Sequence, residues 1–195
     1  MMLTLKTSIL LGGGAKIKPY LQNIEFIDLF FNKIEAKNYQ KIIGINPFGS
    51  SMDYTFKLED WIKLAKNLAN AFPKYLFIFT NFQSNPIQLE EFVAPNLCTF
   101  INNEDLLNLV EITGRFDLLL SMNTGNIHIA DNLQIPTISL NKKKERINCV
   151  GGSYGGEFIP IILPKNWKEN YSKYYEEFYA KALSYIEKLE NKESL

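Results

Sequence analysis

Short apolar runs alternate with longer segments of helical periodicity from residue 41 onward. The runs at 41–46, 75–80 and 117–122 are continuous and of strand length, as is typical of strands covered on both faces. Segment 58–72 carries apolar residues at three- and four-residue spacing, which predicts an amphipathic helix. Strands and helices that alternate in this way predict βαβ units and an α/β fold with a doubly wound parallel sheet.

Shorter segments complete the predicted sheet and its helices. A strand is expected at 97–101 and another at 136–140, and a helix at 124–133 follows the third long strand directly. Asn103 is the expected N-cap of a helix that ends at Gly114. A short acidic helix is expected over 88–92.

The flanks divide the chain into three parts. We expect an N-terminal extension with a partial helix (1–40), a main α/β domain (41–166) and a C-terminal amphipathic helix (167–195). Residues 141–166 are expected to be irregular and include the basic residues Lys142, Lys143 and Lys144.

Composition and charge argue against several classes of protein. The 195 residues suffice for one domain with a full core, and 21 Lys+Arg balance 21 Asp+Glu, which argues against a nucleic-acid binder. Cys98 and Cys149 lie far apart and His128 is the one histidine, so a disulfide scaffold or a Cys/His zinc site is not expected. No apolar stretch is of signal-peptide or membrane-spanning length, which predicts a reduced, cytoplasmic protein.

Candidate chemistry lies in two turns that follow predicted strands, where ligands of open parallel sheets bind. The first turn contains Ser50 and Ser51, whose hydroxyls could hold phosphate oxygens. The second runs into a helix through Thr124 and Gly125, and His128 follows one helical turn later. Unpaired N–H groups at a helix start favour an anion. The alternative is that Thr124 is only an N-cap and His128 only a half-buried helix residue.

Residues 121–137 read SMNTGNIHIADNLQIPT and resemble the signature D-T-G-x-x-H-x-A-x-x-L-x-x-P of the ADP-heptose:lipopolysaccharide heptosyltransferases, glycosyltransferase family 9. The upstream turn at 45–51 and Trp61 match the small-residue turn and the aromatic helix of that family. Asn123 stands where the signature has Asp. The resemblance covers roughly residues 41–140 in consistent order.

The resemblance implies a Rossmann-like domain that forms the carboxyl-terminal, donor-binding half of a GT-B glycosyltransferase. Such a domain binds a nucleotide-diphosphate sugar, here ADP-heptose or another nucleotide sugar, for transfer to a lipopolysaccharide core acceptor. The implied donor-binding residues are Ser50, Ser51, Glu104, Asn123, Thr124, Gly125 and His128. No cofactor and no metal are implied, and no residue of this chain can be assigned as catalytic base.

Length limits this interpretation, because a second Rossmann-like domain of roughly 100 residues does not fit before residue 41. A partner chain or a further domain would have to complete the site. The alternative is a non-catalytic, degenerate domain that binds a nucleotide sugar or a protein partner, and an unrelated flavodoxin-like fold also fits the strand pattern. The basic residues 142–144 make peripheral contact with the inner face of the membrane conceivable, although a solvated loop is the simpler interpretation.

Overall fold

The computed structural model describes residues 19–49, 54–142 and 155–191. Within these residues, seven strands form one sheet in the order β3-β4-β2-β1-β5-β6-β7. All neighbouring strands run parallel except β3, which is antiparallel to β4. The strands are β1 (Lys41–Asn46), β2 (Tyr75–Phe82), β3 (Phe92–Ala94), β4 (Leu97–Asn102), β5 (Leu118–Met122), β6 (Thr137–Lys142) and β7 (Phe158–Leu163).

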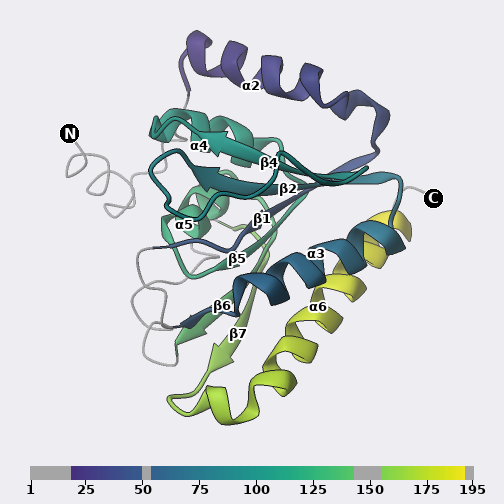
Figure 1. The fold of residues 1–195 in the computed structure, drawn as a ribbon, viewed down its shortest axis with the longest axis vertical. Coiled ribbons are helices and arrows are strands. Elements are labelled where there is room, and N and C mark those ends of the chain that lie inside the picture. The colour runs from purple at the N-terminus through teal and green to yellow at the C-terminus, as the bar shows by residue number, and fades with distance from the viewer. Residues whose placement is uncertain (1–18, 50–53, 143–154, 192–195) are drawn as a thin grey trace.

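Helices cover both faces of the sheet (Figure 1). Helices α3 and α6 pack on one face, and α2, α4 and α5 lie on the other. The helices are α2 (Leu21–Lys33), α3 (Leu58–Ala71), α4 (Leu106–Gly114), α5 (Gly125–Asn132) and α6 (Tyr171–Asn191), with short 3₁₀ turns η1 (Ala36–Asn38) and η4 (Trp167–Asn170). The expected doubly wound α/β fold is confirmed.

The core beneath α3 and α6 is aromatic. Trp61 of α3 and Phe178 of α6 are fully buried and meet edge to face with their ring centroids 5.2 Å apart. Phe56 contacts both rings. The hydroxyl of Tyr171 accepts a hydrogen bond from the backbone N–H of Lys57 at 2.9 Å, which ties the start of α6 to the start of α3. This core packs α3 and α6 against one face of the sheet.

The opposite face has a polar tie between its helices. The Asn23 side chain of α2 donates to Asp105 Oδ2 at 2.8 Å and to Asn108 Oδ1 at 2.7 Å. Phe30 of α2 packs edge to face on Phe100 of β4, with ring centroids 5.0 Å apart. Helix α2, in the N-terminal part of the chain, is therefore packed onto α4 and the sheet.

Three local predictions are wrong. Residues 88–92 do not form a helix, because Thr99 of β4 donates to the carbonyls of Glu90 and Glu91 and Phe92 opens the edge strand β3. Asp105, not Asn103, caps α4 by accepting from Leu107 N at 2.9 Å. Residues 158–163 form strand β7, although we expected all of 141–166 to be irregular.

The backbone conformation of Glu104 explains why α4 begins after Asp105. Glu104 adopts a left-handed conformation with φ of 69°, which a helix cannot contain. The helix therefore begins only after Asp105, and the Asn103 side chain instead accepts from Asn108 Nδ2 at 2.8 Å. Over the residues that the structure describes, none of the helices is both long enough and apolar enough to cross a bilayer.

Candidate functional site

The sheet has a topological switch point between β1 and β5. From β1 the chain moves to β2 and then to β4 on one side, and it returns to place β5 against the other side of β1. Asn46 and Ser121 are paired at the carboxyl ends of these two strands. Ligands of open α/β sheets bind beyond the strand ends at such a point. The segment 123–128 follows β5 directly, so the structure places it at this position.

Helix α5 starts at the switch point with an open first turn. Thr124 is its N-cap, in extended conformation, and its hydroxyl accepts from Asn126 N at 3.3 Å. Gly125 is the first helical residue and is exposed, and a Cβ built on it would meet no atom of the described residues within 4 Å. The backbone of this turn is therefore accessible to a ligand. The N–H group of the exposed Gly125 and the positive end of the helix dipole favour an anion such as phosphate.

Asn46 connects the ends of three strands. Its side chain is 3% exposed, and Nδ2 lies 2.9 Å from Thr124 Oγ1 and 3.3 Å from Ser121 Oγ. Its Oδ1 accepts from Thr80 Oγ1 of β2 at 3.2 Å. Asn46 begins the first turn that the sequence singles out, but it is not among the implied donor-binding residues. A buried strand run that ends in Asn was the available clue, because a polar side chain there needs partners from neighbouring strands.

Gly49 approaches the same threonine from the loop after β1. A Cβ on Gly49 would lie 2.5 Å from Thr124 Cγ2 and 3.2 Å from Met122 Sδ. Only a residue without a side chain allows this approach, so the loop after β1 and the start of α5 are in close contact. The two loops that the sequence singled out therefore lie side by side at Gly49. Ser50 and Ser51 themselves lie outside the described residues.

His128 lies in the first turn of α5, four residues after the N-cap Thr124. Its imidazole is half-buried, and this burial lowers the pKa of His128 below the usual 6.5, an effect that nearby Asp131 partly offsets. The ring is therefore predominantly neutral at pH 7. A neutral imidazole can donate one hydrogen bond to a phosphate oxygen and gains a proton more readily once an anion is bound.

The remaining predicted residues occupy different places. Asn123 is half-buried between β5 and α5, and its backbone N–H donates to Leu140 O at 3.0 Å. Glu104 is exposed in the turn after β4, which β2 separates from β1. The structure therefore groups Asn123, Thr124, Gly125 and His128 at the switch point and leaves Glu104 at a distance along the same edge. Among the described residues, no cluster of three or more Asp, Glu, His or Cys side chains is arranged to hold a metal ion.

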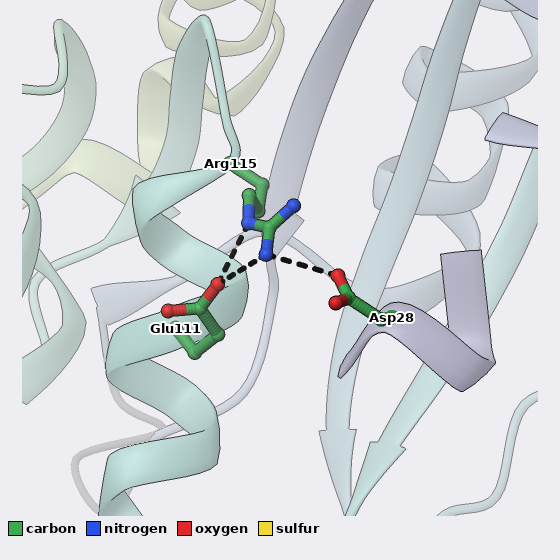
Figure 2. A network of polar contacts seen from close by, with 3 residues as sticks. All are labelled: Asp28, Glu111 and Arg115. Atoms are coloured by element: carbon green, nitrogen blue, oxygen red, sulfur yellow. Dashed lines mark hydrogen bonds and ion pairs between the residues drawn. The ribbon is translucent and has the colours of Figure 1, made fainter. Parts of the chain in front are cut away.

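A surface cavity of about 800 Å³ lies at the opposite, amino-terminal edge of the strands, next to Ile42 and Arg115. The guanidinium of Arg115 forms ion pairs with two carboxylates: Nη2 lies 2.6 Å from Glu111 and 3.0 Å from Asp28 (Figure 2). These contacts join α4 to α2. Because two carboxylates neutralise the guanidinium, this cavity is a poorer anion site than the start of α5.

Comparison with known proteins gives similarity at the level of structure. No protein-family model and no curated protein matches the sequence. The crystal structure of the glycosyl transferase family 9 protein from Veillonella parvula superposes with a TM-score of 0.60 and 16% identity over 82% of this chain and 45% of that one. The E. coli ADP-heptose LPS heptosyltransferase II superposes with a TM-score of 0.55 and 12% identity over 75% of this chain and 44% of that one.

The chain therefore spans less than half the length of either glycosyltransferase. At these identities the likeness concerns the fold: a Rossmann-like α/β domain with a mostly parallel sheet and helices on both faces, similar to one part of each of those proteins.

Proposed function

We propose that this chain is the donor-binding unit of a glycosyltransferase of the lipopolysaccharide heptosyltransferase type. It would hold the diphosphate of a nucleotide sugar at the start of α5. The observation that carries the proposal is the open Thr124–Gly125 turn at the switch point between β1 and β5. The sequence signature and the fold shared with two glycosyltransferases support it.

The residues at the switch point suit the charge of a diphosphate. The exposed backbone at Gly125 and the Thr124 hydroxyl would donate to phosphate oxygens, and His128 would add a donor from the next turn. As the sugar leaves, negative charge grows on the diphosphate. Preorganised donors at a helix start stabilise that charge, so the transfer would not depend on a cation.

Transfer also needs a base that removes the proton of the acceptor hydroxyl. We propose that this base and the surface for a lipopolysaccharide core acceptor come from another domain or chain that faces the carboxyl edge of the sheet. The donor would be ADP-heptose or another nucleotide sugar. Use of a nucleotide-sugar donor would place the protein in the cytoplasm, where it would have peripheral access to the inner face of the membrane.

The test is calorimetric titration of the protein with ADP, UDP and their sugars. We expect Gly125→Val to weaken nucleotide binding at least tenfold, or about 1.4 kcal/mol, because the new side chain enters the space in front of the helix, where a Cβ meets no described atom within 4 Å. Gly114→Ala is the matched control, since Gly114 ends α4 away from the site and its Cβ would make only an ordinary contact, 3.6 Å from Leu133. Absence of nucleotide binding, or equal affinity of wild type and Gly125→Val, would contradict the proposal.

A further inference from the structure

The hydrogen bonds around Asn46 define which way its amide faces. Ser121 Oγ donates to the carbonyl of Met122 at 2.6 Å, so toward Asn46 it can only accept. The group of Asn46 that faces Ser121 and Thr124 is therefore the NH₂, and Oδ1 faces the Thr80 hydroxyl. The network thus determines the amide orientation, which would otherwise be ambiguous.

This orientation has a consequence for Thr124. Its Oγ1 accepts from Asn46 Nδ2 at 2.9 Å and from Asn126 N at 3.3 Å, which occupies both acceptor positions of the oxygen. Its methyl group is held against Gly49, where a Cβ would lie only 2.5 Å from Cγ2. The side chain therefore has one orientation, and its hydroxyl proton remains for a third partner. The open space at Gly125 lies next to it.

We propose that Asn46 is a positioning residue for the anion site: it fixes the Thr124 hydroxyl as a donor and so raises the affinity for a nucleoside diphosphate. Asn46 itself is buried and acts through Thr124. The proposal rests on the proposed function, because the ligand is the diphosphate that the start of α5 would hold. It makes Asn46 and Thr124 one energetic unit rather than two independent contributors.

Asn46→Asp is the informative variant. A carboxylate has nearly the same shape but only accepts hydrogen bonds, so the Thr124 hydroxyl would turn its proton toward it and away from the ligand. Asn46→Ala removes the contact without adding charge and separates this effect from repulsion between a carboxylate and the diphosphate. Asn108→Asp is the matched control: Asn108 is also buried and hydrogen-bonded, but it lies between α2 and α4.

The experiment is a double-mutant cycle on ADP affinity at pH 7.5, with Thr124→Val as the second change. We expect Asn46→Asp and Asn46→Ala each to weaken binding about tenfold in the wild-type background and less than twofold in the Thr124→Val background. Asn108→Asp should change affinity less than twofold. Equal losses in both backgrounds, or no loss in the wild-type background, would overturn the positioning role.

A pH series distinguishes positioning from a merely structural role. The affinity of Asn46→Asp relative to wild type should recover as the pH falls and the carboxyl becomes protonated, because the protonated group can donate to Thr124 again. A ratio that is independent of pH, with a lowered melting temperature as the sole effect, would overturn the inference. Failure of the wild-type chain to bind ADP would instead contradict the proposed function and, with it, this role; binding without coupling would contradict the role alone.

Discussion

His128 shows at the residue scale how burial sets the state of a candidate ligand contact. Its pKa lies below the ordinary 6.5 because the half-buried ring loses solvation as a cation, and Asp131 offsets this only in part. The folded protein therefore binds fewer protons at this site than the unfolded chain. The stability that His128 contributes is complete above pH 6.5 and declines as the pH falls below that value.

We predict that His128→Gln flattens this dependence. Wild type should lose more unfolding free energy than the variant between pH 7 and pH 5, because only the wild-type chain takes up the additional proton on unfolding. Urea unfolding at a series of pH values measures the difference. Parallel curves for the two proteins would show that burial does not disfavour the imidazolium of His128.

The sequence pattern is enough to single out the Thr124–Gly125 turn as a candidate, but it does not predict that Asn46 hydrogen-bonds to Thr124. Thr124 and Gly125 follow a strand in a recognisable pattern, whereas Asn46 reaches Thr124 across a separation of 78 residues. No local pattern encodes that pairing. It follows from the register of β1 against β5, which only the folded sheet defines.

At the scale of the elements, the long apolar strands were predictable because they are buried on both faces and carry few polar interruptions. Strand β7 was missed because Pro160 interrupts its apolar run, and proline usually argues against a strand. The structure places β7 at the edge of the sheet, where one side of the strand needs no partner. The wrong helix at 88–92 lies against the other edge, where pairing with β4 overrides local propensity.

Gly44 allows strand β1 to pack closely against the ring of Phe116. A Cβ on Gly44 would lie 2.3 Å from two ring carbons of Phe116, which is buried against this face of the sheet. We predict that Gly44→Ala destabilises the fold by about 1–3 kcal/mol, because the ring or the strand must shift. Chemical denaturation measures the loss.

The second change Phe116→Leu should recover part of this loss if the clash is its cause, since a smaller side chain leaves room for the new methyl group. An unchanged midpoint for Gly44→Ala, or strictly additive losses in the double variant, would refute this account of how β1 packs.

At the scale of the whole molecule, the described residues form one layered domain whose switch point lies at the carboxyl edge of the sheet. Two longer glycosyltransferases contain a similar domain, which makes up less than half of each. The proposed division of labour follows: this chain binds the donor, and a facing domain or chain supplies the acceptor surface and the base. The division of the sequence at residues 40 and 166 stays a prediction.

The central claim is that a nucleoside diphosphate binds at the start of α5. The most direct measurement is titration of the isotope-labelled chain with ADP, followed by backbone amide resonances. The account predicts saturable shifts that are largest at Thr124, Gly125 and Asn126, with Arg115 at the opposite edge unaffected. Saturable shifts confined to the cavity near Arg115, or no shifts at millimolar ADP, would contradict it.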